Sequence, residues 1–434
     1  MNPRVVSLIV ILLSLSAFVN SQVVDYDSIC HVIRSEKVEK FEQWLSTKTM
    51  QKRTFADEIY RIPVVVHVLH TGEAIGEGAN ISDEQILSQI RVLNEDFRRK
   101  EGTRGFNSNP SGGDAKIEFV LAKSAPDGLA TNGIVRVNVR LKEPAHFGGS
   151  LIAIGAYYSI WNPNDYFNIW AFPVLPDILL GEARFPISDL PGPKGDTTFI
   201  IPGIDTLNGV PVSQIDGIAI NTYNFGETHS DSSKYNLGRT GTHETGHFLG
   251  LFHTWGATGF GGSCGNDDYC DDTPPTDGRT VGCPLNRLAC DGSRAMIENY
   301  MDYTDDECMN IFTIDQIRRM RTVLENSPRR KSLLTSKGLY APTNIPLISG
   351  DDVKVYPTPG VDLLFIEFPQ YYKGKTELNF YDTSGKLINS VLNYIDGKTT
   401  VTTEIPNHNN NILILKIVTT NGVIVKKVLV IPSE

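Results

Sequence analysis

The first two thirds of the chain alternate between apolar runs of strand length and apolar residues at helical spacing. Residues 61–69 (RIPVVVHVL) form a nearly continuous β-branched run, which predicts a buried strand. Residues 82–85 (SDEQ) have the capping-box pattern that marks the start of a helix. The next apolar residues recur at steps of four, three and four, and so share one helix face: Ile86, Ile90, Leu93 and Phe97. The pattern predicts a strand followed by an amphipathic helix.

Two more apolar runs predict further strands, at residues 116–122 (KIEFVLA) and 166–172 (YFNIWAF). A strand, a helix and then more strands predict an α/β (α+β) domain with a mostly parallel sheet. A second capping box (TIDQ) opens a predicted helix over residues 313–325. The polar residues 22–57 contain one predicted helix, around residues 35–45.

The pattern changes in the last hundred residues. Residues 336–351 are rich in Gly, Pro, Asn and Ser, and we expect them to form a linker. Short strands alone follow, and Asn421-Gly422 joins two of them, residues 412–419 and 423–430, as a hairpin turn would. Residues 352–434 are therefore predicted to form an all-β sandwich.

The amino terminus has the pattern of a secretory signal. Arg4 precedes an apolar stretch of about 14 residues, and a cleavage site is predicted before Gln22. The alternative is a membrane anchor, but a spanning helix needs roughly 20 apolar residues. We expect residues 1–21 to be removed, leaving an exported protein, secreted or at the cell surface, with no transmembrane segment. Export permits disulfide bonds.

Composition and charge narrow the classes of partner. The chain has 434 residues, 40% of them apolar, so it can bury a sizeable core, and its net charge is -10. An acidic chain lacks the cationic surface that phosphates require, which argues against nucleic acid as a partner. The acidic excess is concentrated in residues 264–308, which hold 11 acids and three arginines.

Residues 243–253 (HETGHFLGLFH) carry the chemistry. His243 and His247 are four apart, so on a helix they share a face and can bind one metal ion. Gly250 allows the chain to leave the helix and bring His253 to the third ligand position. Three imidazoles leave one position on zinc for water, as catalytic sites do, and Glu244 would be its general base and then acid.

Some 50 residues downstream, the run NYMDY (299–303) supplies two more candidates. Met301 is predicted to form a methionine turn, an apolar floor beneath the histidines, rather than an ordinary core contact. Tyr303 is predicted to donate its phenolic proton to the tetrahedral oxyanion; the alternative is a packing tyrosine.

Five segments together resemble the pappalysin-type metzincin metallopeptidases: residues 62–70, 81–99, 241–256, 271–275 and 299–313. The resemblance implies two subdomains on either side of a zinc cleft, with protein or peptide substrates. It also implies that residues 181–185 form an edge strand that holds substrate by β-augmentation, whereas the alternative is a plain loop.

The same resemblance suggests the roles of the cysteines and of the acidic loop. It implies two disulfides, Cys264–Cys290 and Cys283–Cys308, with zinc-cluster binding as the alternative. It implies a structural Ca²⁺ with hard oxygen ligands from this loop, rather than a merely solvated loop; the candidate ligands are Asp268, Asp271 and Thr273.

Cys30 lies in the segment where relatives of this family carry a cysteine whose thiolate occupies the open zinc position and keeps the precursor inactive. Cys30 is followed by His31, where that pattern has Gly, which leaves a Cys30–Cys270 bridge or a free thiol as alternatives. Lys52-Arg53 would be a place for maturation.

Residues 353–431 resemble the type IX secretion sorting domain, which implies the secretion machinery as a partner, with a substrate- or carbohydrate-binding sandwich as the alternative. The whole chain is predicted to be a secreted zinc endopeptidase, and the alternative is an exported binding protein or adhesin with a vestigial metal site. The predicted organisation is signal peptide 1–21, pro-segment 22–57, metalloprotease domain 58–335, linker 336–351 and sandwich 352–434.

Overall fold

The structure is a computed structural model, and its description covers most of the chain. The described residues are 30–32, 38–49, 58–143, 145, 150–174, 179–189, 205–228, 234–256, 263–342, 350–360, 362–370, 372–397, 399–406, 412–419 and 422–431. The signal segment and the Lys52-Arg53 pair therefore lie outside the described residues. The chain divides into two compact units, and each is described by itself. The first comprises residues 1–126 and 131–340, and the second comprises residues 127–130 and 341–434.

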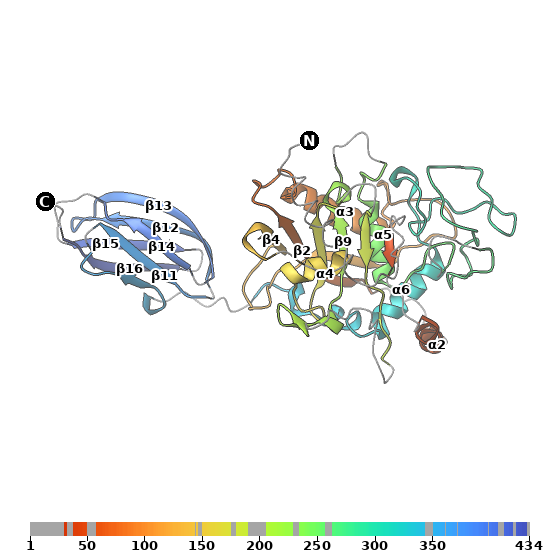
Figure 1. Cartoon of the computed structure of the whole chain (residues 1–434), viewed down its shortest axis with the longest axis horizontal. Helices are drawn as coiled ribbons and strands as arrows, with labels where there is room; N and C mark the ends of the chain where they lie inside the picture. Colours follow the sequence, from red (N-terminus) through yellow and green to blue (C-terminus); the bar gives the residue numbers. More distant parts are fainter. Residues whose placement is uncertain are drawn as a thin grey trace. The chain divides into compact units, whose positions relative to one another are not determined.

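The first unit is built on a seven-stranded sheet with the order β1-β6-β9-β5-β2-β3, in which β4 also pairs with β2 (Figure 1). Its strands are β1 (Cys30–Val32), β2 (Tyr60–His70), β3 (Ile117–Leu121), β4 (Ile134–Asn138), β5 (Phe167–Phe172), β6 (Gly181–Ala183) and β9 (Ile218–Asn221). The pairs are parallel except that β6 runs antiparallel to β9. A separate short pair consists of β7 (Thr206–Leu207) and β8 (Val210–Pro211). The prediction of an α/β domain with a mostly parallel sheet is confirmed.

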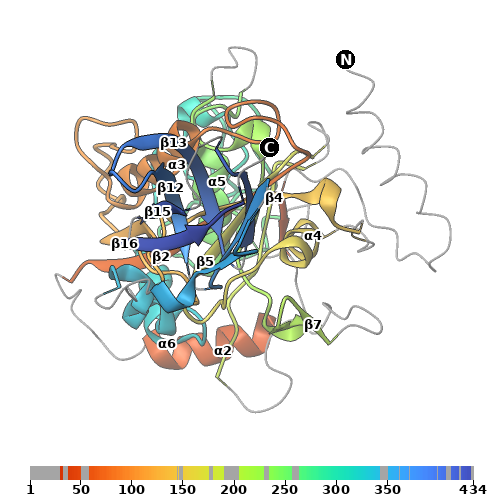
Figure 2. The same ribbon diagram turned by 90° about the vertical axis from the view of Figure 1, so that its left-hand side faces the viewer.

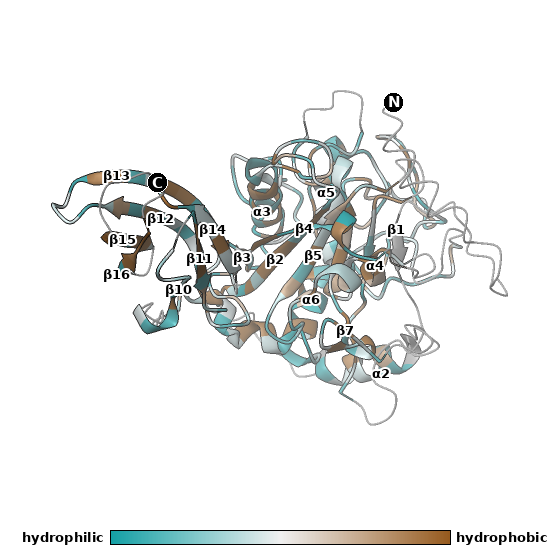
Figure 3. Cartoon of the chain, turned by 60° about the vertical axis from the view of Figure 1, so that its left-hand side comes forward, coloured by the Kyte–Doolittle hydropathy of each residue, from teal (hydrophilic) through white to brown (hydrophobic). Residues whose placement is uncertain are grey.

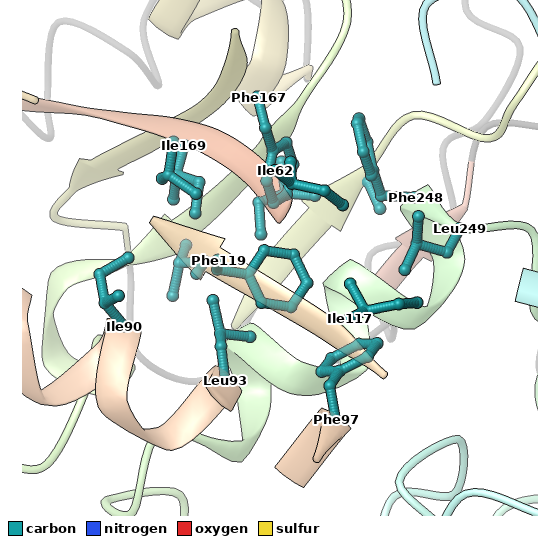
Figure 4. Packing of buried hydrophobic residues seen from close by; sticks show 14 of the residues in the cluster. Ile62, Ile90, Leu93, Phe97, Ile117, Phe119, Phe167, Ile169, Phe248 and Leu249 are labelled. Atoms are coloured by element: carbon teal, nitrogen blue, oxygen red, sulfur yellow. The ribbon is translucent and has the colours of Figure 1, made fainter. Parts of the chain in front are cut away.

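Helices cover both faces of this sheet. The helices of the first unit are α2 (Val38–Thr49), α3 (Asp83–Phe97), α4 (Leu151–Tyr158), α5 (Arg239–Phe248) and α6 (Ile314–Asn326). One core cluster joins apolar residues of α3, α5 and α6 to one sheet face, and Figure 4 shows Leu93, Phe119 and Phe248 converging there. A second cluster joins α4 to Trp170 and Ala219 on the other face. Figure 3 shows hydrophobic colour along β2 and mixed colours on α3, as expected of a buried strand and an amphipathic helix.

Local signals set the helix starts as predicted. Ser82 Oγ accepts a hydrogen bond from the Gln85 N–H, and Thr313 with Gln316 forms a complete capping box. Short 3-10 turns complete the unit: η1 (Val139–Leu141), η2 (Val212–Gln214), η3 (Thr222–Asn224), η4 (Asp306–Cys308), η5 (Lys331–Thr335) and η6 (Lys337–Leu339). Among the residues described, no helix is both long enough and apolar enough to cross a membrane.

Where the second unit is described, it is all-β apart from one 3-10 turn, η7 (Gly350–Asp352). One sheet has the order β10-β11-β14 and the other β13-β12-β15-β16, whose strands lie side by side in Figures 1 and 2. The strands are β10 (Lys354–Tyr356), β11 (Leu363–Phe368), β12 (Lys373–Tyr381), β13 (Leu387–Asp396), β14 (Thr399–Glu404), β15 (Ile412–Thr419) and β16 (Gly422–Leu429). Residues of both sheets share one core, so the predicted sandwich is confirmed, as is the antiparallel pairing of β15 with β16.

Candidate active site

Helix α5 carries three of the four predicted metal-site residues, and a tight reversal supplies the fourth. Gly250 has φ +93°, a left-handed conformation that favours glycine, and the Leu251 N–H donates to the Gly246 carbonyl, 2.9 Å away. The reversal lets His253 come back beside the helix. His243, His247 and His253 are thereby brought together, as the spacing predicted.

The three imidazoles form a compact, buried cluster of nitrogen atoms. The Nε2 atom of His247 lies 3.1 Å from those of His243 and His253, which are 3.3 Å apart. The Nδ1 atoms of His243 and His247 lie 2.7 Å from the backbone carbonyls of Tyr300 and Leu251. A carbonyl only accepts, so these Nδ1 atoms carry the protons and the Nε2 lone pairs face one another.

Burial lowers the pKa of His243 to about 4, which keeps its imidazole neutral. Lone pairs that converge in this way repel one another unless a cation lies between them. The donor set therefore fits a metal ion, and buried imidazoles that donate Nδ1–H to a carbonyl are typical of metal ligands.

Met301 lies beneath α5, fully buried. A Cβ atom added to Gly246 would lie 2.4 Å from Met301 Sδ, so the helix needs glycine at the point where it crosses the sulfur. The neighbouring backbone supports the ligands as well, because the Tyr300 carbonyl accepts from His243 and the Met301 carbonyl accepts from the Thr254 N–H. These two carbonyl contacts join segments far apart in sequence, and the sequence gives no signal for them.

Glu244 is fully buried and lies against β6, the second strand of the sheet. A Cβ atom added to Gly181 in β6 would come within 2.7 Å of the Glu244 side chain. The strand predicted at residues 181–185 is present as β6, shorter than expected. It is not at the edge of the sheet, because β1 pairs with it in parallel, with Cys30 opposite Gly181. The backbone of Cys30 thus lies next to the strand residue that contacts Glu244.

Tyr303 is buried among the aromatic rings of the site. Its ring centroid lies 5.5 Å from that of His243 and 5.0 Å from that of His253. Trp255, which the sequence reasoning did not single out, stacks on His253 with centroids 4.3 Å apart and also contacts Tyr303. A small hollow beside the histidines is lined by Tyr303, Glu244, Leu180 and Met309, among others.

Behind α5 lies a buried polar network that sequence reasoning also missed. Arg239 forms an ion pair with Asp96, 3.2 Å apart, and Thr242 Oγ1 donates to the same carboxylate at 2.6 Å. Burial raises the pKa of Asp96 to about 6 despite Arg239. Because Asp96 belongs to α3, the network fixes the helix of the histidines against its neighbour.

The cysteine-rich loop is stapled by two disulfides, Cys264–Cys290 and Cys283–Cys308. Cys270 is a free thiol, buried, so the alternative of a Cys30–Cys270 bridge is wrong. Burial raises the pKa of the Cys270 thiol, which keeps it protonated.

Several oxygen atoms of the same loop are buried with no partner at hydrogen-bond distance, and three of them lie within six residues: Asp268 Oδ2, Asp272 Oδ1 and Thr273 Oγ1. Burial raises the pKa of Asp268 to about 8, and the nearby Asp267 charge adds to the shift. Orphaned buried oxygens on two acids and a threonine fit a hard cation. Asp271, also a predicted ligand, is exposed instead.

Comparison with known proteins places these features in a family. The family model described as pregnancy-associated plasma protein-A matches residues 207–325, which include the histidine cluster and Met301. A model described as a secretion system C-terminal sorting domain matches residues 354–431.

Individual relatives agree. An extracellular metalloprotease of Arthroderma otae is 32% identical over 60% of this chain and 76% of its own length. Extracellular metalloprotease 1 of Coccidioides posadasii is 32% identical over 59% and 74%. Among solved structures, a promirolysin mutant of Tannerella forsythia is 35% identical with a TM-score of 0.54, covering 69% of this chain and 92% of that one. Mature mirolysin in complex with a cleaved peptide has a TM-score of 0.52, covering 67% and 100%. The chain belongs to the pappalysin family and is a secreted metalloendopeptidase that carries a C-terminal sorting domain.

Proposed function

We propose that the chain is a zinc endopeptidase in which His243, His247 and His253 hold the metal. The observation that carries the proposal is the convergence of the Nε2 atoms of three buried imidazoles, 3.1–3.3 Å from one another. Zinc bound there would lower the pKa of a water and polarise the scissile carbonyl.

The protein's own groups do the rest. Glu244 follows His243 on α5, takes the proton of the attacking water and returns it to the leaving amine. Because Glu244 is buried, little water screens its carboxylate, and its interactions with the attacking water and with the leaving amine are stronger than they would be at the surface. Tyr303, packed on two of the imidazoles, donates its phenolic proton to the oxyanion. Substrate would pair with β6, whose Gly181 contacts Glu244.

Metal analysis combined with a cleavage assay tests the proposal. The activated protein should bind one zinc per chain, lose casein cleavage on treatment with a chelator and regain it when zinc is restored. An adhesin with a vestigial site would bind little zinc or show no cleavage. Cleavage that persists after complete removal of zinc would contradict the assignment.

We further propose that the orphaned oxygens of Asp268, Asp272 and Thr273 hold a structural Ca²⁺. The melting temperature of the first unit should rise with Ca²⁺ and not with Mg²⁺, because small Mg²⁺ demands a tighter octahedron. Asp268→Asn should abolish the rise, measured by calorimetry. Asp277→Asn, which changes a 73% exposed side chain in the same region, is the control and should retain it. An equal response of both variants would rule out the site.

The Cys30 thiolate is proposed to keep the precursor latent by occupying the open zinc position. The pairing of Cys30 with Gly181, beside Glu244, supports this role. A Cys30→Ala precursor should therefore become active sooner than wild type, followed by continuous peptide hydrolysis. Cys270→Ala, which removes the buried free thiol of the cysteine-rich loop, should keep the wild-type lag. Equal lags for Cys30→Ala and wild type would end the proposal.

We propose that export and maturation involve three segments. Residues 1–21 are cleaved as a signal peptide, residues 22–57 are removed as a pro-segment, and residues 352–434 are recognised by the secretion machinery. The metalloprotease domain would comprise residues 58–335 and the linker residues 336–351. The sorting-domain match to residues 354–431 supports the recognition of residues 352–434 by the secretion machinery. Deleting residues 352–434 should leave the protein in the periplasm, detected by fractionation.

A further inference from the structure

The helix of the proposed pro-segment, α2, is seated on a surface of the first unit that combines aromatic rings with one cation. Three buried side chains of α2 (Phe41, Trp44 and Leu45) cluster with Val323 of α6, and Phe41 packs edge-on against Phe185 at 5.5 Å. Helices α2 and α6 lie side by side in Figures 1 and 2. The Trp44 indole also donates to Asp189.

At the centre of this surface, Arg319 binds the carboxylate of Glu42 with both terminal nitrogens, at 2.7 and 2.5 Å. The side chains are only 6% and 10% exposed, so the pair is largely removed from water. A buried charge that loses its partner is strongly destabilised. The pair therefore makes the docking selective for a carboxylate among apolar side chains.

The surface residues that bind α2 are held in place by contacts that do not involve α2. The Nε–H of Arg319 donates to the Gly250 carbonyl at 2.6 Å, and its guanidinium faces the rings of Phe252 and Tyr269 at 5.1 and 5.5 Å. Phe252 in turn stacks on Phe185 at 4.8 Å. A guanidinium fixed by one carbonyl and two rings is preorganised to bind a carboxylate through its remaining nitrogens.

The surface is continuous with the active site. Phe185 follows β6 by two residues, and β6 is the strand beside Glu244. Phe252 directly precedes the metal-site residue His253, and Gly250 lies in the turn between His247 and His253. A polypeptide that pairs with β6 and continues past Ala183 would therefore reach Phe185 and Arg319, as the chain from β1 to α2 does.

We propose that Arg319, Phe185, Phe252 and Val323 form an exosite for segments of protein substrates that carry a carboxylate between apolar or aromatic residues, and that α2 occupies this exosite in the precursor. The inference rests on the proposed release of the pro-segment. The exosite favours long substrates bearing such a segment over short peptides that fill only the cleft. In the precursor, α2 adds a second contact that holds the pro-segment, separate from Cys30.

A labelled peptide tests the exosite directly. The full chain is cut at Lys52-Arg53 with trypsin, the pro-segment is removed by gel filtration, and fluorescein-labelled peptide 38–49 is titrated in by anisotropy. The peptide should bind, and Glu42→Gln in the peptide should weaken binding by at least about tenfold, since a desolvated charge loses its partner. The Gln43→Ala peptide, changed at an exposed position, is the matched control and should bind like wild type.

A competition experiment connects the exosite to substrates. The wild-type peptide should inhibit casein cleavage and leave hydrolysis of a six-residue substrate unchanged, and Arg319→Lys in the enzyme should weaken the inhibition. Absence of binding, equal binding of the Glu42→Gln peptide, or retention of α2 on the cut chain would overturn the proposal. The binding measurement stands even if the cut chain cleaves neither substrate, a result that would contradict the proposed protease function instead.

Discussion

Glu244→Gln in the activated enzyme is expected to lower kcat for peptide hydrolysis by about a thousandfold, within the range for loss of a general base. The substitution keeps the size of the side chain but removes its ability to accept the proton of the water. Glu244 is fully buried beside Gly181, so solvent is poorly placed to take over the proton transfer. Zinc content, measured by mass spectrometry, should stay at one per chain because no metal ligand has changed.

Two comparisons make this result specific. Glu325→Gln, at a glutamate that accepts a hydrogen bond from the Tyr60 hydroxyl, should leave kcat unchanged. His247→Ala should lower both zinc content and activity, which separates loss of the metal from loss of the base. Cleavage by Glu244→Gln within tenfold of wild type would show that another group takes the proton.

The spacing of the metal-site residues could be predicted from the sequence because it is local. A helix places His243 and His247 on one face whatever surrounds it. Gly250 indicates where the chain reverses, and in the structure this glycine has φ +93°. Helix starts at Ser82 and Thr313 were equally predictable, since each cap involves residues three apart.

The supporting contacts could not be predicted because they depend on tertiary packing. The Tyr300 carbonyl that orients His243 lies 57 residues away in sequence, and any carbonyl looks alike in a sequence. Asp96 and Arg239 form a buried pair 143 positions apart, and nothing local distinguishes them from surface charges. The alternative of a Cys30–Cys270 disulfide was wrong for the same reason, because a count of cysteines does not reveal that Cys270 is a buried free thiol.

Asp216→Asn is expected to destabilise the first unit by about 3–5 kcal/mol, the cost of leaving a buried charge without its partner. Asp216 Oδ2 accepts from Arg330 at 2.8 Å and from Arg329 at 2.6 Å, and the Asp216 and Arg330 side chains are each 1% exposed. The isosteric amide fills the same space but leaves the Arg330 guanidinium buried and uncompensated. Asp277→Asn, at an exposed ion pair, should cost less than about 1 kcal/mol in the same urea titration.

The stability lost in Asp216→Asn should also depend on pH in a defined direction. Burial by itself would raise the pKa of Asp216, but Arg330 and Arg329 outweigh it and hold the pKa below its ordinary value of 3.8. The stabilisation is therefore present above about pH 3.8 and disappears as the pH falls through the lower pKa of the folded state, where the stabilities of wild type and Asp216→Asn should converge.

Arg330 also donates to the carbonyls of Phe248, at the end of α5, and Arg184, which follows β6. Loss of the Asp216 charge would free Arg330 and loosen the metal-site helix from β6, so kcat/KM should fall together with stability. An active variant of wild-type stability would contradict this role.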